Sequence, residues 1–306
     1  MIRVKFLLIA SFFTTACLAT SSIDVEARYA QFDIRFLELR GQHSVPSFQA
    51  SQWTSNKSEE AILAEFKSLN KKRKAIWEHS DFNGNPGLIA NKFYRRDDSI
   101  AFAYNSVSPH YNASLVSLDY KRFLALEAPF EHNVRHFFDI LIQYNVTDLV
   151  RLTPVSDDSD IQYDTPIKCH PYWEEQAVGL TEQSSILSLN SQPIRYYVME
   201  DWVDGKGMSA KRLLNLINCV RSQQSNNSVI ACHCCAGVGR TGTFIAAYLL
   251  LDQADEQISQ GIPPEDVQIS VEDVVMQLSM QRRCCVATKS QYLTLYRILD
   301  QYLVKQ

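Results

Sequence analysis

The stretch ACHCCAGVGRTG, which runs from Ala231 to Gly242, separates an apolar segment from a helical one. Before it, residues 228–232 (SVIAC) are apolar enough for a central strand. After it, residues 241–251 (TGTFIAAYLLL) have the composition of a buried helix. Residues 234–240 therefore form a tight strand-to-helix turn. Because the first N–H groups of a helix have no partner within the helix, the turn predicts a site for an oxyanion.

Three kinds of chemistry compete for this turn. Its glycines fit the G-x-G-x-x-G of a dinucleotide-binding turn, but residues 256–264, where the next strand and its acidic residue should follow, are polar and contain proline. Its cysteines suggest a metal cluster, but the adjacent pairs Cys234-Cys235 and Cys284-Cys285 lack the spacing of zinc ligands. Cys234 and Arg240 form a C-x5-R loop, and this third interpretation explains every residue.

In the C-x5-R interpretation, Cys234 is a thiolate nucleophile that the N–H dipoles and the helix N-terminus stabilise. Arg240 binds two phosphoryl oxygens in a bidentate manner during an in-line displacement. Gly237 and Gly239 allow the backbone to curl with its N–H groups directed inward. The Thr241 hydroxyl is placed to donate a hydrogen bond to the thiolate and to help it leave. Neither a metal nor a cofactor is required.

Residues 233–242 (HCCAGVGRTG) resemble the signature loop HCSAGVGRTG of the phosphotyrosine-specific protein tyrosine phosphatases, the cysteine-dependent C-x5-R phosphatases. Cys235 stands where the family usually has serine. Further stretches resemble the family in the same order over about residues 85–304: YNAS at 111–114, FLALEAP at 123–129, IKCHPYW at 167–173 and QRxxxVATxxQY at 281–292. The resemblance implies the family's fold, an α/β domain with a central twisted mixed sheet flanked by helices. It also implies hydrolysis of phosphotyrosine in proteins.

The resemblance implies a general acid upstream of the cysteine, in the family's mobile W-P-D loop. Residues 202–204 (WVD) stand at a suitable distance, so Asp204 is expected to protonate the leaving tyrosine, with Asp201 as the competing residue. Val203 in place of proline is expected to loosen this loop.

Other site residues follow from the same resemblance. His233, at the start of the signature, is grouped with the catalytic residues. Gln291 is expected to direct water at the phosphocysteine, whereas the family's other glutamine is replaced by Ala287. Tyr94 is expected to stack on the substrate ring, and Lys168 to reach toward the acid loop. The substrate phosphate is expected to contact the loop residues Cys235, Ala236, Gly237, Val238, Gly239 and Arg240.

Two alternatives remain open. Ala287, Val203 and Cys235 together are compatible with a pseudophosphatase that binds phosphotyrosine without turnover. A broader phosphatase, of dual or phosphoinositide specificity, is the second, although the neutral Cys235, Ala236 and Val238 disfavour substrates with several phosphates. A reversible disulfide bond from Cys234 to Cys235 or Cys169 would protect the nucleophile against oxidation and so regulate the protein.

The N-terminus has the charged start and short apolar run of an export signal, predicted over residues 1–19. The run is too short to span a bilayer. As an alternative to simple cleavage of the signal, Cys17 could carry a lipoprotein-type lipid anchor. The sequence thus predicts an exported protein, such as a secreted bacterial effector. A buried N-terminal strand or helix would instead leave it in the cytoplasm.

A formal charge of -4 argues against a nucleic-acid partner.

The remaining chain divides into an extension of uncertain structure (20–58) and a single catalytic domain (59–306). Helices are predicted at 59–77, 132–144, 209–223, 239–258, 271–280 and 289–303, from apolar residues at helical spacing. Strands are predicted at 101–104, 111–116, 122–127, 148–152, 194–199 and 229–232, from short apolar or alternating runs between turns.

Overall fold

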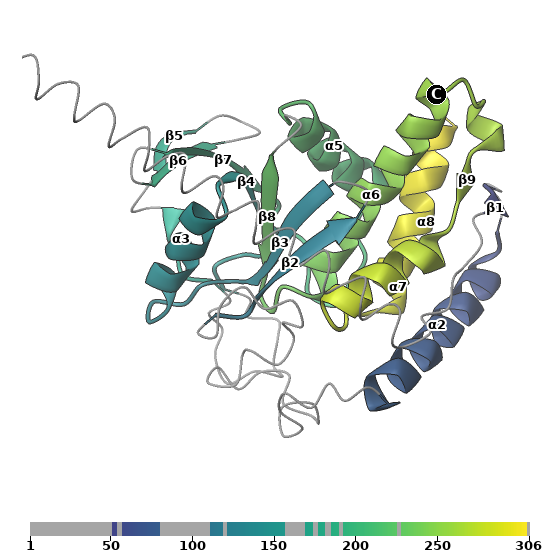
Figure 1. Cartoon of the computed structure of the whole chain (residues 1–306), viewed down its shortest axis with the longest axis horizontal. Coiled ribbons are helices and arrows are strands. Elements are labelled where there is room, and N and C mark those ends of the chain that lie inside the picture. The colour runs from purple at the N-terminus through teal and green to yellow at the C-terminus, as the bar shows by residue number, and fades with distance from the viewer. Residues whose placement is uncertain are drawn as a thin grey trace, which may run out of the picture. The chain divides into compact units, whose positions relative to one another are not determined.

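A seven-stranded sheet organises the chain, in the order β2 (Ala113–Leu118), β3 (Lys121–Glu127), β8 (Val229–Cys234), β4 (Val146–Arg151), β7 (Gln192–Val198), β6 (Ser185–Leu189) and β5 (Ala177–Leu180) (Figure 1). The computed structural model describes residues 51–53, 57–79, 111–118, 121–156, 169–173, 177–180, 185–189, 192–224 and 228–304. All of these belong to one unit, residues 45–306.

The sheet is mixed, as the sequence predicts. Strands β3, β8, β4 and β7 are parallel, and the outer strands β2, β6 and β5 pair antiparallel. All six residues of β8 are buried, which agrees with its apolar composition and its central position. Ligands bind outside the carboxyl ends of parallel strands in such sheets, so the end of β8 is the expected place for a site.

Helices cover both faces of the sheet. α5 (Ala210–Arg221), α6 (Gly239–Ser259), α7 (Val271–Gln281) and α8 (Lys289–Leu303) lie on one face, and α3 (Val134–Gln143) lies on the other (Figure 1). Strand β8 contributes to both layers because its side chains alternate. Ile230, Cys232 and Cys234 join the core under α6, whereas His233 contacts Phe137 of α3.

The expected strands and helices within the described residues are present, with ends shifted by a few residues. β8 extends to Cys234, two residues beyond its predicted end, so the nucleophile candidate is the last residue of the strand. The short strands β5 and β6 at one edge of the sheet do not follow from the sequence pattern, because β5 contains Gly179 and Ile186 of β6 is exposed. The strand predicted at 101–104 lies outside the described residues.

Part of the predicted N-terminal extension packs on the domain. Strand β1 (Ser51–Gln52) pairs antiparallel with β9 (Gln268–Ile269), which follows the short 3-10 helix η3 (Pro264–Asp266). Trp53 continues this contact: its backbone N–H donates to Val267 O at 2.7 Å, and its indole Nε1 donates to Asp300 Oδ1 at 3.1 Å. Residues 51–53 of the predicted extension thus pack on elements of the predicted catalytic domain.

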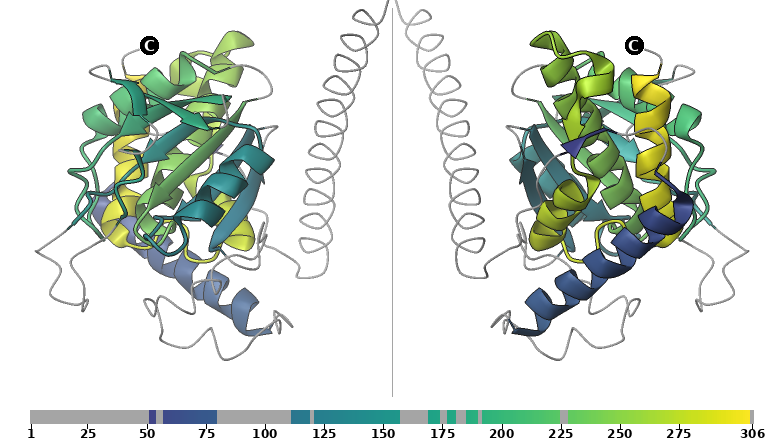
Figure 2. Two further views of the ribbon diagram at one scale, coloured as in Figure 1. Left: turned by 90° about the vertical axis from the view of Figure 1, so that its left-hand side faces the viewer. Right: turned by 90° about the vertical axis from the view of Figure 1, so that its right-hand side faces the viewer.

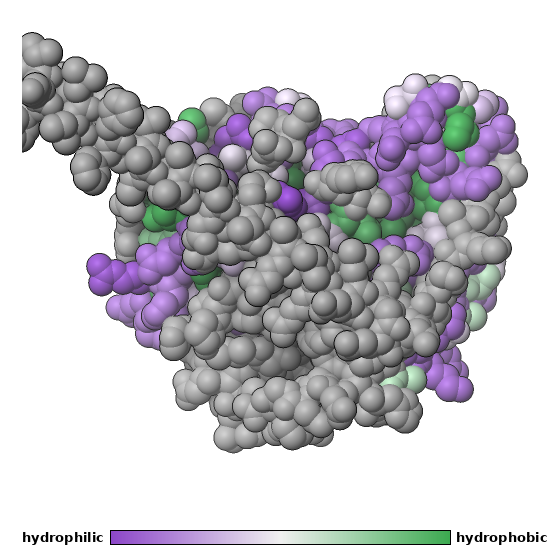
Figure 3. Space-filling view, viewed as in Figure 1, coloured by the Kyte–Doolittle hydropathy of each residue, from purple (hydrophilic) through white to green (hydrophobic). Residues whose placement is uncertain are grey.

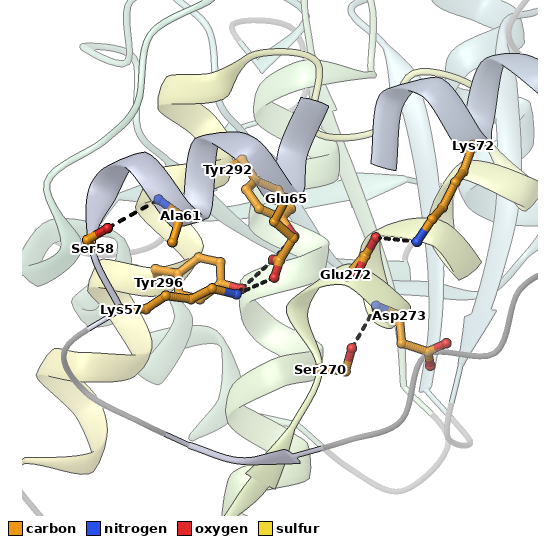
Figure 4. Close-up of polar contacts among 10 residues, drawn as sticks. All are labelled: Lys57, Ser58, Ala61, Glu65, Lys72, Ser270, Glu272, Asp273, Tyr292 and Tyr296. Carbon is orange, nitrogen blue, oxygen red and sulfur yellow. Dashed lines mark hydrogen bonds and ion pairs between the residues drawn. The ribbon is translucent and has the colours of Figure 1, made fainter. Parts of the chain in front are cut away.

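Helix α2 (Glu59–His79) lies across α7 and α8 (Figure 2). Ile62, Phe66 and Leu69 recur at helical spacing and enter the core. Polar contacts flank them: the Glu65 carboxylate accepts hydrogen bonds from the hydroxyls of Tyr292 and Tyr296 (Figure 4). The helix is therefore held on α8 by buried apolar and polar contacts together.

The coloured surface in Figure 3 is mostly hydrophilic, and apolar residues show only in small separate areas. The exposed large hydrophobic side chains of the described residues come from different elements: Ile186, Val198, Val203 and Val304. None of the helices in the described part of the chain has the length and apolar character needed to cross a membrane. The predicted leader (1–19) and Cys17 lie outside the described residues.

Candidate active site

The predicted oxyanion site lies where β8 passes into α6. Cys234 ends the strand, Gly239 begins the helix, and residues 235–238 form the turn between them. Cys234 is buried, whereas Cys235 and Ala236 are half-buried. Because the first N–H groups of α6 have no partner within the helix, they are directed toward the turn. The positive end of the helix dipole adds to the attraction for an anion.

Gly237 is the position at which the turn requires glycine. Its φ is +67°, in the left-handed region, and a Cβ there would lie 2.0 Å from Leu126 O. The turn is also fixed to β3 by a hydrogen bond of 2.9 Å from the Ala128 N–H to Cys235 O. The curled backbone that the sequence predicts is thus packed against the neighbouring strand.

Arg282 braces the turn from outside. Its guanidinium is buried and donates to the backbone carbonyls of Ala236 (3.0 Å, from Nη2) and Gly237 (from Nε), and also to Ser114 Oγ (3.0 Å, from Nη1). Since the C=O and N–H of a trans peptide point in opposite directions, carbonyls held on the outside direct N–H groups inward. Arg282 belongs to the stretch QRxxxVATxxQY at 281–292, but its place in that stretch alone does not predict this role.

Arg240 connects the turn to the acid loop. Its side chain is 1% exposed, its Nη1 donates to Trp202 O at 2.8 Å, and its Nη2 lies 3.2 Å from Asp204 Oδ1. Trp202 is buried, and its Nε1 donates to Lys206 O at 2.9 Å, a hydrogen bond that joins the two ends of the acid loop. The structure therefore brings Asp204 to the arginine of the C-x5-R loop.

The competing residue, Asp201, is paired with a different arginine. It forms an ion pair with Arg212 of α5, and both side chains are about half exposed. Val203, where the family has proline, is 52% exposed and packs little. The acid loop is anchored instead at Gly205, whose carbonyl accepts from Thr288 Oγ1 (2.9 Å) and Ser290 Oγ (3.1 Å).

Gln291 lies beside the start of α6. Its Oε1 accepts hydrogen bonds from the N–H groups of Ala287 (2.9 Å) and Thr288 (3.2 Å), within the capping box of α8. Its Nε2 is buried without a hydrogen-bond partner and would lie 2.9 Å from a Cβ at Gly239. The amide is therefore oriented with its N–H donors toward the turn. Ala287 itself is exposed.

His233 and Thr241, the two residues that flank this part of the signature, are both buried. His233 is buried on the α3 side of the sheet, where its Nε2 lies 2.7 Å from the Tyr172 hydroxyl. Burial raises the pKa of the Cys232 thiol, and the neighbouring Cys234 adds to this effect. The Thr241 hydroxyl is buried without a hydrogen-bond partner among the described residues, and its contact with Cys234 stays a prediction. Tyr94 and Lys168 lie outside the described residues.

Burial, with a smaller contribution from Arg151, lowers the pKa of His233 from 6.5 to about 3. The folded protein keeps this ring neutral, whereas the unfolded chain takes up a proton below about pH 6.5. Stability is thus fully present above pH 6.5 and is lost as the pH falls toward 3. Between about pH 7 and pH 4.5 we expect His233→Gln to lose about 2–3 kcal/mol less unfolding free energy than the wild type. Urea unfolding at both pH values measures this, and equal losses would contradict it.

The cysteines of the described residues are free thiols: Cys169, Cys219, Cys232, Cys234, Cys235, Cys284 and Cys285. Burial raises the pKa of the Cys169 thiol strongly, and Cys235 adds to this effect. Cys169 donates to His170 O at 3.3 Å. Within the described part of the chain, no group of three or more His, Cys, Asp or Glu side chains is arranged to hold a metal ion.

A family model described as protein-tyrosine phosphatase matches residues 180–301, a range that contains Cys234, Arg240, Asp204 and Gln291. The mouse receptor-type tyrosine-protein phosphatase alpha is 27% identical over 210 residues, which cover 59% of this chain and 23% of that protein. Tyrosine phosphatase H3 of Microplitis demolitor bracovirus is 24% identical over 248 residues, which cover 71% of this chain and 75% of that protein. The chain spans between 13% and 28% of the length of the receptor-type relatives it matches.

Solved structures confirm the predicted fold. The Trypanosoma cruzi protein tyrosine phosphatase TcPTP1 matches with a TM-score of 0.59 and 20% identity, over 82% of this chain and 93% of that one. PTPN18 in complex with HER2 phosphopeptides matches with a TM-score of 0.60 and 18% identity, over 81% of this chain and 95% of that one.

Proposed function

We propose that this chain, which carries a domain of the protein-tyrosine phosphatase family, hydrolyses phosphotyrosine in proteins through a cysteinyl-phosphate intermediate. The observation that carries the proposal is the convergence of three groups on one turn. Cys234 ends β8, Arg240 lies in the first turn of α6, and Asp204 lies 3.2 Å from Arg240. A nucleophile, an anion-binding group and an acid are thus together in one site.

In the first step, the Cys234 thiolate attacks phosphorus while the turn N–H groups and Arg240 hold the phosphoryl oxygens. The bond from phosphorus to the tyrosine oxygen breaks, and Asp204 gives that oxygen a proton. Because Asp204 lies 3.2 Å from Arg240, the proton donor and the phosphoryl group would share one site.

In the second step, water attacks the phosphocysteine and releases phosphate and the Cys234 thiolate. Gln291 is suited to direct this water, because its Nε2 lies beside the start of α6 and has no hydrogen-bond partner there. Its carbonyl oxygen is already occupied by the Ala287 and Thr288 N–H groups, so the amide is preset as a donor. The buried Gln291 favours turnover over a pseudophosphatase, even though Ala287 replaces the other glutamine.

For the substrate, we propose phosphotyrosine in proteins. The side chains of the turn, Cys235, Ala236 and Val238, are neutral and offer no further site for a second phosphate. A solved relative, PTPN18, is described in complex with phosphopeptides. We also propose export of the protein, on the basis of the charged start and apolar run within residues 1–19.

Asp204→Asn tests the assignment of the acid. We expect kcat for phenyl phosphate to fall by about 10²–10³-fold, because the asparagine amide cannot supply the proton that a strongly basic leaving group needs. An activated aryl phosphate with a weakly basic leaving group should lose far less. Steady-state hydrolysis in the presence of a chelator measures both.

The matched control is Asp201→Asn, which removes a neighbouring carboxylate that pairs with Arg212 outside the site. It should leave kcat within about twofold. An equal effect of both variants would contradict the assignment to Asp204. Wild-type protein that binds phosphopeptide but shows no hydrolysis would instead support the pseudophosphatase.

A further inference from the structure

The α7–α8 loop, residues 283–288, adopts a backbone that ordinary residues avoid. Cys284 has φ +64° and Val286 has φ +55°, although neither is glycine. A β-branched residue is especially unfavourable in the left-handed region. Such conformations persist where surrounding structure fixes them, and they gather at functional sites.

Arg73 of α2 fixes this loop from a distant part of the chain. Its side chain is buried, and its Nη1 donates to Cys285 O at 2.7 Å and to Ser279 Oγ at 2.9 Å. The carbonyl that it holds lies between the two left-handed residues. The guanidinium also packs over the Phe66 ring, at 5.6 Å from the ring centroid, and this contact helps to orient the guanidinium.

The same loop controls the second-step glutamine. Its Ala287 and Thr288 N–H groups hold Gln291 Oε1, and so set which way the amide faces. The loop is also pressed against the first turn of α6, since a Cβ at Gly242 would lie 2.8 Å from Val286 N and 2.9 Å from Cys285 Cα. A shift of the Cys285 peptide therefore moves the donors that orient Gln291.

We propose that Arg73 is a positioning residue for hydrolysis of the phosphocysteine, acting through Cys285 O and the α7–α8 loop on Gln291. The proposal rests on the function proposed above. The first step depends on contacts that Arg73 does not make. Arg282, which ends α7 before the loop, and Ala128 brace the turn, and Trp202 O and Asp204 hold Arg240. Arg73 thus affects the two chemical steps unequally.

The test is pre-steady-state hydrolysis of an aryl phosphate by full-length Arg73→Met, which keeps a long apolar side chain on Phe66 but removes the donors. We expect a burst of about one phenol per enzyme at a rate within about twofold of the wild type, followed by turnover slowed about 10-fold. Gln291→Ala should show the same pattern. Arg73→Lys keeps a charged donor group, so its turnover rate should lie between those of Arg73→Met and the wild type. This variant replaces Arg73→Met in the test if the methionine variant does not fold.

The matched control is Lys72→Met on the same helix, which breaks the 3.0 Å ion pair with Glu272 in the first turn of α7 (Figure 4). It should match the wild type in both the rate of phenol release in the first turnover and the rate of steady-state turnover. A second readout does not depend on activity: hydrogen exchange of the Ala287 and Thr288 amides should be faster in Arg73→Met and unchanged in Lys72→Met.

Equal slowing of both steps in Arg73→Met and Arg73→Lys, or unchanged partitioning, would overturn the positioning role while leaving the phosphatase activity established. Absence of hydrolysis in the wild type would overturn the proposed function itself. In that case the exchange data still report whether Arg73 orders the loop.

Discussion

Cys234→Ser is expected to abolish turnover, with kcat for an aryl phosphate lowered by at least about 10⁴-fold, or about 5.5 kcal/mol. The serine hydroxyl is not ionised near neutral pH and attacks phosphorus far more slowly than a thiolate. It has nearly the same volume as the thiol and sits at the buried end of β8, so the turn should keep its shape. Stopped-flow and steady-state assays at matched substrate concentration measure the loss.

Binding separates loss of the nucleophile from loss of the fold. Because Arg240 and the turn N–H groups remain, Cys234→Ser should still bind a phosphotyrosine peptide, measured by calorimetry. Cys219→Ser is the matched control, since this half-buried thiol lies on α5 away from the turn, and it should leave kcat unchanged. Residual turnover near the wild-type level in Cys234→Ser would rule out the cysteinyl-phosphate mechanism.

Arg240→Lys is expected to lower kcat/KM by about 10³-fold or more, and to weaken phosphopeptide binding at the same time. Lysine keeps the positive charge but cannot form the planar, bidentate contact with two phosphoryl oxygens. It also cannot reproduce the paired contacts of the guanidinium with Trp202 O and Asp204. The acid loop should therefore lose order together with the anion site.

Arg221→Lys provides the comparison for this substitution. Arg221 is also largely buried and ion-paired, with Asp252 and Asp255, but it lies on α5 away from the turn. The two variants should lose similar stability in thermal unfolding, whereas only Arg240→Lys should lose activity and binding. If Arg240→Lys bound phosphopeptide as tightly as the wild type, the turn would not be the phosphate site.

The centre of the fold follows from local patterns in the sequence. Residues 229–232 form a short apolar run before a glycine-containing turn, and residues 239–258 form a long helical segment, so β8 and α6 were predicted with nearly their observed bounds. The nucleophile and Arg240 could be placed because both lie within this one strand-turn-helix unit. Asp204 and Gln291, by contrast, were placed only by resemblance to a family.

Contacts between distant segments could not be read from such patterns. Arg73 and Cys285 are separated by 212 positions, and Arg282 and Ser114 by 168, so no periodicity connects them. His233 shows a different limit: it adjoins the nucleophile in sequence, but alternation along β8 turns its side chain to the α3 layer. Two residues that are neighbours in a strand thus have side chains on opposite faces of the sheet.

The pairing of Arg240 with Asp204 and with Trp202 O has a consequence for ligand entry. Arg240 is already paired with an anion, the Asp204 carboxylate, so binding of a phosphoryl group is an exchange of one anion for another at a single guanidinium. A monovalent ion gains little in this exchange, because it brings no more charge than the carboxylate that it displaces. A phosphate dianion brings twice that charge to the same donors, so the exchange itself discriminates by valence.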